Sequence, residues 1–325
     1  MYNYLGHGSY GCVIEPYIPC SSSSNNKNKK NVKYISKIFR YKHDWEEEIK
    51  KQKIIKKIDS KHKFTVELIS YCDLTENEFK IKEIKDYEKC NFTHINKNNY
   101  QIIYEYGGID LSRLLKVYSN TIDIYKFMKS LINIFNGIVI LDKKKYIHND
   151  IYIKNIIFNM DTYVCKLIDF GFLVNIKDLY NQKNLGFIYQ TYRYYPPEYN
   201  IFFFKNYKNI NTYVFIDYIY KYIDIIKNNH IEKLYKDIIN DIKTNFKVII
   251  NKHKYKGYEN KINVYMLGIC LFEIIIYMLM YIKDIKLPII ELCDLIKKMV
   301  CINPEQRITS KEALDIYTKL FNSNS

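Results

Sequence analysis

Two motifs near the middle of the sequence combine carboxylates with an amide. His148-Asn149-Asp150 is followed, five residues after its aspartate, by Asn155, and the surrounding pattern predicts a loop between short strands. Asp150 can accept or orient the proton of an attacking hydroxyl, and the amide oxygen of Asn155 can bind a metal ion. Asp169-Phe170-Gly171 follows fourteen residues after Asn155 and supplies a second carboxylate for Mg²⁺. Each motif alone also fits an ordinary polar turn.

Glycines near the N-terminus predict a phosphate-binding turn. Gly6, Gly8, Gly11 and Val13 form the pattern Gly-x-Gly-x-x-Gly-x-Val after a predicted strand. Because glycine has no Cβ, its backbone amide can approach phosphate oxygens closely. The spacing also fits a structural hairpin or a dinucleotide-binding turn, but the latter requires a helix directly after the glycines. Residues 12–18 are instead typical of a second strand, which favours a flap over phosphates.

Lys37 is the third chemical candidate. It lies in an otherwise apolar strand, residues 34–39, where an unpaired ammonium group would be costly to bury. A lysine in such a strand often faces solvent, but its place after the glycine turn makes it a candidate to contact the α- and β-phosphates of a nucleotide. It would need a carboxylate from the helix predicted over about 44–58. Glu48 is the first choice and Glu47 remains an alternative.

The elements that must position these groups change in type along the chain. Strands dominate about the first hundred residues, two glycines at 107 and 108 break the pattern, and helices dominate the remainder, with one long helix predicted over 122–144. The apolar stretch 264–282 is long enough to cross a membrane, but it contains Glu273, a charge that is costly in lipid, so we interpret it as a buried helix. The order predicts an α+β protein with two lobes and a ligand cleft between them.

Two segments lie outside this plan. Residues 21–31 are a polar, low-complexity run that we interpret as a surface loop, and residues 199–258 are rich in Tyr, Ile and Lys and mainly helical in pattern. The small lobe is therefore placed at 1–105 and the large lobe at 106–320, with an insertion at about 199–258.

Charge and cysteine content bound the environment of the protein. The net charge of +15 comes from scattered lysines, which we interpret as a solvated basic surface, so that nucleic acid is not indicated as a partner, although attraction to acidic partners stays open. The eight cysteines show no repeated Cys-x-x-Cys pairing, and no secretory leader is seen at Met1. We therefore predict a soluble, intracellular protein in a reducing compartment, with no membrane partner.

In this order, the motifs resemble those of the protein kinase superfamily. The family signature comprises a glycine-rich loop, a strand lysine, a catalytic loop, Asp-Phe-Gly and Ala-Pro-Glu. Residues 191–198, Thr-Tyr-Arg-Tyr-Tyr-Pro-Pro-Glu, resemble the end of an activation segment, and residues 263–268 resemble the start of the buried helix of the large lobe. Arg307 resembles the arginine that pairs with the glutamate of that segment. The hinge, residues 104–111, resembles that of haspin-like kinases and of kinases from large DNA viruses.

The resemblance implies a two-lobed protein kinase-like fold that transfers the γ-phosphoryl group of ATP to a protein substrate. It implies Asp150 as the catalytic base, Lys154 at the γ-phosphate, and Asn155 and Asp169 as ligands of Mg²⁺. The residues implied to bind ATP are Leu5, Gly6, Gly8, Gly11, Val13, Lys37, Glu48, Glu105 and Asp110. Thr191, seven residues before Glu198, matches serine/threonine kinases. We therefore expect a cytoplasmic protein. If its origin is viral, it would be found in the host cytoplasm or in the virion.

Several neighbours of the catalytic groups depart from the family pattern. Asn149 stands where most kinases have an arginine that docks a phosphorylated activation segment, Tyr152 replaces a lysine, and Asn263 replaces an aspartate that braces the catalytic loop. These changes keep a pseudokinase, a nucleotide-binding scaffold without turnover, as the alternative. A further alternative is an enzyme of the same fold that transfers the phosphoryl group to a small molecule or a lipid.

Overall fold

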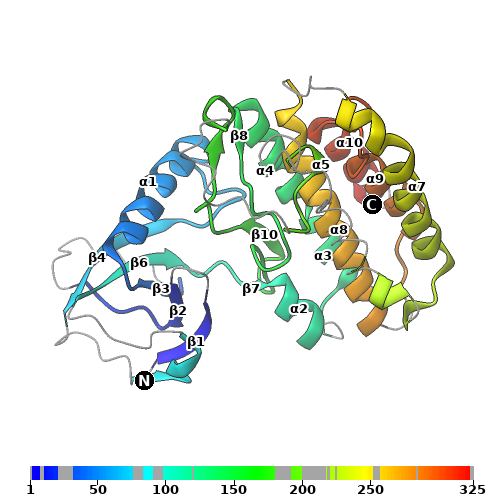
Figure 1. Ribbon diagram of the computed structural model, residues 1–325. Coiled ribbons are helices and arrows are strands. Elements are labelled where there is room, and N and C mark those ends of the chain that lie inside the picture. The colour runs from blue at the N-terminus through cyan, green and yellow to red at the C-terminus, as the bar shows by residue number, and fades with distance from the viewer. Residues whose placement is uncertain are drawn as a thin grey trace. The chain divides into compact units, whose positions relative to one another are not determined.

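The computed structural model describes residues 2–7, 11–20, 32–75, 83–90, 98–118, 121–179, 192–199, 217, 220–223, 225–251, 257–282 and 285–322. The low-complexity segment 21–31 and much of the predicted insertion, including 200–216, lie outside these ranges. The chain divides into two compact units, Met1–Gly107 and Gly108–Ser325 (Figure 1). The boundary thus falls two residues after the predicted end of the small lobe, at the two consecutive glycines.

The first unit is built on a six-stranded sheet with the strand order β4-β6-β3-β2-β1-β5. Neighbouring strands run antiparallel except β5, which pairs parallel with β1. The strands are β1 (Tyr2–His7), β2 (Gly11–Glu15), β3 (Tyr34–Phe39), β4 (Leu68–Thr75), β5 (Ile84–Lys85) and β6 (Asn98–Glu105). A short 3-10 helix, η2 (Tyr87–Cys90), follows β5. The prediction that strands dominate about the first hundred residues is therefore confirmed.

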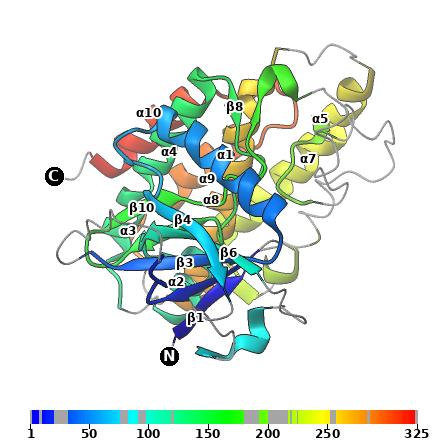
Figure 2. The same cartoon turned by 90° about the vertical axis from the view of Figure 1, so that its left-hand side faces the viewer.

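Helix α1 (Lys42–Ile58) packs against β3 and β6 of this sheet (Figure 2). Its buried residues recur at helical spacing, and the indole Nε1 of Trp45 donates a hydrogen bond of 2.9 Å to the carbonyl oxygen of Gln101 in β6. The predicted start at residue 44 is wrong by two residues. Within the described residues, the N-cap Tyr41 makes no side-chain cap hydrogen bond, and Glu47 accepts a hydrogen bond from Lys50.

Two disulfide bonds cross-link the first unit. Cys12 in β2 is bonded to Cys90 in η2, and Cys20 is bonded to Cys72 in β4. The paired cysteines are 78 and 52 residues apart in the sequence, so no local spacing signals either bond. The cysteine pattern led us to predict a reducing compartment, where disulfide bonds are not expected, so the sequence did not predict these two bonds. The intracellular location stays a prediction.

The second unit is mainly helical. Its long helix α8 (Ile262–Tyr281) packs with α2 (Leu111–Val117), α4 (Ile132–Lys143), α9 (Ile289–Met299) and α10 (Ser310–Asn322), and α7 (Asn229–Asn251) lies beside α9 (Figure 1). Two described stretches are long and apolar enough to cross a membrane by length and composition alone, but 94% of the window in 259–281 is buried inside the protein. This burial is typical of a core helix.

The single helix predicted over 122–144 is two helices in the structure, α3 (Ile124–Ser130) and α4. They meet at Leu131, whose backbone N–H donates to the carbonyl oxygen of Met128, three residues earlier. This tighter turn separates the two helices although the apolar spacing continues through it.

Two small sheets frame the loops of the second unit. Strand β9 (Ile156–Asn159) lies between β7 (Ile109–Asp110) and β10 (Val164–Leu167), while β8 (Tyr146–Ile147) pairs with β11 (Val174–Asn175). Gly108 enters β7 with a φ of +122°, and a Cβ there would lie 2.2 Å from the carbonyl oxygen of Phe158. Only glycine fits this position, which explains the second glycine of the predicted hinge.

Candidate active site

Asp150 lies in the loop between β8 and β9 and has both carboxylate oxygens engaged. Its Oδ2 accepts a hydrogen bond of 2.7 Å from the side-chain amide of Asn155, which also donates to the carbonyl oxygen of Asp150 at 2.9 Å. Its Oδ1 accepts one of 2.5 Å from the hydroxyl of Tyr192. Withdrawal from solvent raises the pKa of Asp150 to about 7, against the hydrogen bond from Tyr192, which lowers it.

Asn155 and Asp169, the residues predicted to hold Mg²⁺, carry the oxygen ligands that this ion prefers. Both nearby hydrogen bonds of Asn155 use its amide nitrogen, which leaves the amide oxygen for a cation. The carbonyl oxygen of Asn155 accepts a bond from the backbone N–H of Ile168, and Asp169 follows directly. Mg²⁺ takes oxygen ligands and commonly uses one or two protein side chains together with phosphate and water. Among the described residues, no cluster of three or more His, Cys, Asp or Glu could hold a metal by itself.

Asn263 braces the catalytic loop in spite of replacing an aspartate. Its side-chain oxygen accepts a hydrogen bond of 3.0 Å from the backbone N–H of His148. Its amide nitrogen donates to Asp142 Oδ1 at 2.7 Å and to the carbonyl oxygen of Tyr146 at 2.9 Å. The loop is therefore tied to α8 and to the end of α4. Burial raises the pKa of Asp142 to about 7, although hydrogen bonds from Ser310 and Asn263 oppose the shift.

His148 supports the loop in its neutral form. The side chain is fully buried, and this burial lowers the pKa of its imidazole to about 4. Its Nδ1 accepts a hydrogen bond from the backbone N–H of Asp150 at 3.3 Å, and its ring lies 4.7 Å from the ring of Phe170. The histidine thus links the catalytic loop to the Asp-Phe-Gly motif by packing.

Asn149 links the two described ends of the activation segment. Its amide nitrogen donates to the carbonyl oxygen of Phe172 at 3.0 Å, and its amide oxygen accepts a hydrogen bond from the hydroxyl of Tyr199. The backbone of Asn149 has a φ of +64°, a left-handed conformation that asparagine tolerates better than most residues. Neutral hydrogen bonds therefore join this position to the segment.

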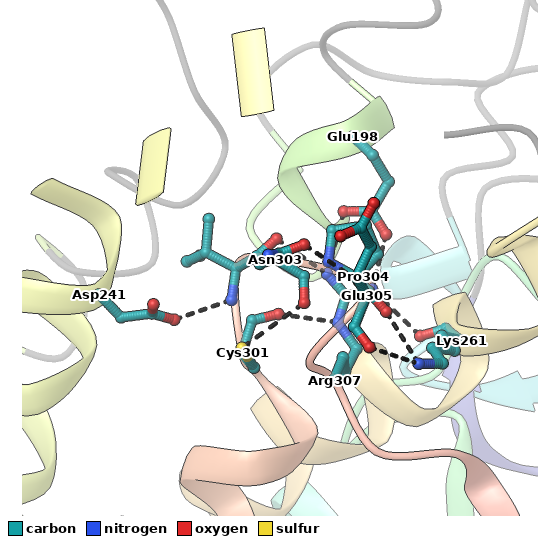
Figure 3. A network of polar contacts seen from close by, with 9 residues as sticks. Glu198, Asp241, Lys261, Cys301, Asn303, Pro304, Glu305 and Arg307 are labelled. Atoms are coloured by element: carbon teal, nitrogen blue, oxygen red, sulfur yellow. Dashed lines mark hydrogen bonds and ion pairs between the residues drawn. The ribbon is translucent and has the colours of Figure 1, made fainter. Parts of the chain in front are cut away.

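The Pro-Pro-Glu end of the segment is held by a buried ion pair (Figure 3). Arg307, only 1% exposed, donates to both carboxylate oxygens of Glu198 at 2.6 and 3.0 Å, and its Nε donates to the carbonyl oxygen of Cys301 at 2.9 Å. The pairing between residues 198 and 307 that the resemblance implied is present. Asp241 of α7 accepts a hydrogen bond of 2.8 Å from the backbone N–H of Ile302, so this helix of the predicted insertion is tied to the same loop.

In the first unit, Lys37 is paired with Glu48. Lys37 Nζ lies 3.3 Å from Glu48 Oε1, and the two side chains are 12% and 6% exposed. The hydroxyl of Tyr104 donates to the same Glu48 oxygen at 3.0 Å, which fixes the carboxylate. Glu47 instead pairs with Lys50 at 2.6 Å on the exposed side of α1. The sequence left open which glutamate pairs with Lys37, and the structure shows that it is Glu48.

The two described glycines of the glycine turn, Gly6 and Gly11, differ in how strictly their surroundings require glycine. A Cβ on Gly11 would lie 2.6 Å from the backbone oxygen of Ile38, so this glycine permits close strand pairing. A Cβ on Gly6 would meet nothing within 4 Å. Leu5 and Val13 lie in β1 and β2, where Val13 pairs with Lys37 in the register of β2 and β3. Gly8 lies outside the described residues.

The remaining predicted site residues lie at element ends and in loops. Glu105 ends β6, and its backbone N–H donates to the carbonyl oxygen of Glu67 at 3.0 Å. Asp110 is the N-cap of α2 and accepts a hydrogen bond from the backbone N–H of Arg113 at 3.0 Å. Lys154 is exposed in the catalytic loop, and Thr191 lies outside the described residues.

Sequence reasoning missed Tyr192. It belongs to a cluster of tyrosines in which its ring centroid lies 5.2 Å from that of Tyr194 and 4.8 Å from that of Tyr195. Tyr152, which replaces the usual lysine, packs on the same cluster at 5.6 Å from Tyr194. The repeated tyrosines of 192–195 were the visible signal, but their contact with a loop 42 residues earlier had no signature.

Comparison with known families agrees with this geometry. The family model of the protein tyrosine and serine/threonine kinases matches residues 1–212, more than half of the chain. The chain therefore belongs to the protein tyrosine and serine/threonine kinase family, which confirms the predicted superfamily and the two-lobed kinase fold. No curated protein matches the sequence significantly.

Proposed function

We propose that this protein is an active kinase that transfers the γ-phosphoryl group of ATP to serine or threonine hydroxyls of a protein substrate. The family supports phosphotransfer to proteins. The observation that carries activity is the arrangement of Asp150 and Asn155. One amide group orients the carboxylate of the base through Oδ2, and Oδ1 already accepts a hydrogen bond from a hydroxyl. This is the contact that an acceptor needs before transfer.

Each unit contributes a separate part of the proposed chemistry. In the first unit, Lys37, held by Glu48, would contact the α- and β-phosphates, and the backbone near Glu105 would meet the adenine edge. In the second unit, Asp150 orients the acceptor hydroxyl and takes its proton. Mg²⁺, held by Asn155 and Asp169, would neutralise charge on the phosphates. Lys154 is proposed to reach the γ-phosphate from its exposed position.

The choice of serine and threonine rests on sequence. Thr191 matches the threonine that contacts the catalytic loop in serine/threonine kinases, and the Pro-Pro-Glu segment that follows is typical of enzymes with a peptide acceptor. The buried pair of Glu198 with Arg307 supports an ordered segment at this place. A small-molecule acceptor would be revealed by screening both acceptor classes side by side.

The first test is transfer from labelled ATP to a mixture of basic and acidic proteins, followed by phosphoamino-acid analysis. The wild type should give phosphoserine or phosphothreonine, and Asp150→Ala should give neither because the acceptor loses its base. Phosphotyrosine alone on the added proteins would refute the serine/threonine assignment. Asp161→Ala, at an exposed turn between β9 and β10, is the matched carboxylate control and should retain transfer.

A pseudokinase is the second candidate, and a specific observation favours it. The hydroxyl of Tyr192 donates a hydrogen bond to Asp150 Oδ1, the oxygen that the hydroxyl of an external acceptor would use. Tyr152, which replaces a lysine, packs on the tyrosine cluster. A scaffold of this kind would bind ATP tightly and transfer nothing to any acceptor, itself included. Isothermal titration with ATP, run beside the transfer assay, separates the two functions.

A further inference from the structure

The side-chain amide of Asn263 is held in one orientation by the groups around it. Its oxygen accepts a hydrogen bond of 3.0 Å from the backbone N–H of His148, and its nitrogen donates to Asp142 Oδ1 at 2.7 Å and to the carbonyl oxygen of Tyr146 at 2.9 Å. If the amide were flipped, its NH₂ group would face the N–H of His148 and its oxygen would face two acceptors. All three hydrogen bonds would then be lost, so only one orientation fits.

Asp142 supplies the carboxylate in this arrangement. It lies in α4, Asn263 lies in α8, and the second oxygen of Asp142 accepts a hydrogen bond from the hydroxyl of Ser310 in α10. An ionised carboxylate only accepts hydrogen bonds, so it meets the NH₂ end of the amide and excludes the oxygen end. When Asp142 is protonated, as its raised pKa allows near neutral pH, the hydroxyl of Ser310 can accept a hydrogen bond from the acid, and Oδ1 stays an acceptor.

The orientation of Asn263 is transmitted to the base. The N–H that its amide oxygen holds belongs to His148, and Nδ1 of that histidine accepts a hydrogen bond of 3.3 Å from the backbone N–H of Asp150. His148 is fully buried, so solvent does not compete for these hydrogen bonds. Three successive hydrogen bonds therefore connect Asp142 to Asp150, and all of their members lie in the second unit.

We propose that Asp142 is a positioning residue for the base Asp150 and acts through Asn263 and His148. This role rests on the proposed function, because the position of a base affects a rate only in an enzyme that uses one. Transfer needs the base within hydrogen-bond reach of the acceptor hydroxyl, and a misplacement of about 1 Å can cost roughly 100-fold in rate. Asp142 itself touches neither the acceptor nor the nucleotide in this role.

The main experiment compares two substitutions of Asp142 in the full-length protein, assayed by transfer from ATP to the protein mixture. Asp142→Leu keeps the branched shape but has no acceptor, so it should lower kcat roughly 10- to 100-fold while KM for ATP stays within about twofold. Asp142→Asn should stay within about threefold of the wild-type kcat, because its amide oxygen can accept from Asn263 while its NH₂ group donates to Ser310. Asp161→Leu, at the exposed turn between β9 and β10, is the matched control and should change neither constant.

A double-mutant cycle tests whether Asp142 acts through Asn263. Asn263→Ala should lower kcat by itself, and adding Asp142→Leu to it should cause little further loss, because the amide that Asp142 orients is already gone. If the two losses multiply instead, Asp142 acts by another route and the proposal is overturned.

Hydrogen exchange at the backbone amide of His148 gives a readout that needs no turnover. Measured by mass spectrometry with fragmentation that resolves this residue, exchange should be slow in the wild type and in Asp142→Asn, and at least about tenfold faster in Asp142→Leu. A His148 amide that exchanges in the wild type as fast as in an unstructured chain would overturn the proposal, even if Asp142→Leu fails to fold.

The outcomes separate the positioning role from the proposed function. If Asp142→Leu keeps the kcat of the wild type, Asp142 does not position the base and the kinase assignment stands. If the wild type binds ATP but transfers phosphate to no acceptor, the kinase assignment fails and the positioning role falls with it, whatever the exchange rate of the His148 amide.

Discussion

Replacing Arg307 with methionine should destabilise the second unit severely. The guanidinium group makes two hydrogen bonds to Glu198 and one to the carbonyl oxygen of Cys301, and it lies 4.7 Å from the ring of Tyr265. Methionine fills a similar volume but leaves the carboxylate of Glu198, which is 2% exposed, without its counter-charge. Removing one partner of a buried pair costs about 3–5 kcal/mol, because an uncompensated charge stays in the interior.

A double-mutant cycle isolates the pair from the lost packing. Glu198→Gln removes the charge that Arg307→Met strands, so the double variant should recover about 2 kcal/mol relative to the sum of the single variants. Urea unfolding followed by far-ultraviolet circular dichroism is the assay, because the helices lie mainly in the second unit. Arg113→Met, on the exposed face of α2, is the matched control and should change stability by less than about 0.5 kcal/mol.

Either of two results would contradict a stabilising role for the buried pair of Glu198 and Arg307. A loss of less than about 1 kcal/mol in Arg307→Met would mean that the Glu198 charge finds solvent or protonates at little cost. A double variant whose loss equals the sum of the single losses would mean that the two side chains do not act as a pair.

Three further predictions concern a titrating carboxyl, the lysine partner and the disulfides. Asp142 has a pKa raised to about 7, so the folded state holds its proton where the unfolded chain releases it, and stability should fall as pH rises from about 4 to 7. When the free energy of unfolding is measured with urea at several pH values, Asp142→Asn should reduce this loss by about 2 kcal/mol. That is about half of the energy that corresponds to the full pKa shift, because the side chain keeps partial solvent contact. Glu48→Ala should lower kcat/KM about 100-fold by releasing Lys37, whereas Glu47→Ala should retain activity; similar losses in both would contradict the pairing. Reduction of both disulfides should lower the stability of the first unit by about 4 kcal/mol for each bond, measured by the fluorescence of Trp45, and an unchanged midpoint would show that they contribute nothing.

The elements that the sequence predicted well are those with strong local signals. The strand-rich beginning, the glycine break and the buried helix with Glu273 all depend on periodicity or on residues with special backbone requirements, such as Gly108. Thr309 and Glu312 form a capping box before α10, with the backbone N–H of each bonded to the side chain of the other. Local chemistry decides these features, so tertiary packing does not override them.

The features that escaped prediction depend on distant contacts. The break between α3 and α4 follows from a turn at Leu131 in an unbroken apolar pattern. The choice of Glu48 over Glu47 depends on which face of α1 meets the sheet, and Tyr104 completes that choice from 56 residues away. Tyr192 reaches Asp150 only because the tyrosine cluster and the pair of Glu198 with Arg307 shape the segment between them. No spacing rule contains such contacts.

The distribution of sulfur has a consequence for how the two units respond to their surroundings. All eight cysteines are described, and the four that are bonded lie in the first unit, while the four in the second, Cys165, Cys270, Cys293 and Cys301, are thiols. A change of thiol–disulfide potential can therefore open the covalent cross-links of the first unit, whereas reduction breaks no disulfide in the second unit. Strand β2, which follows the glycine turn, is one of the elements whose cross-link depends on that potential.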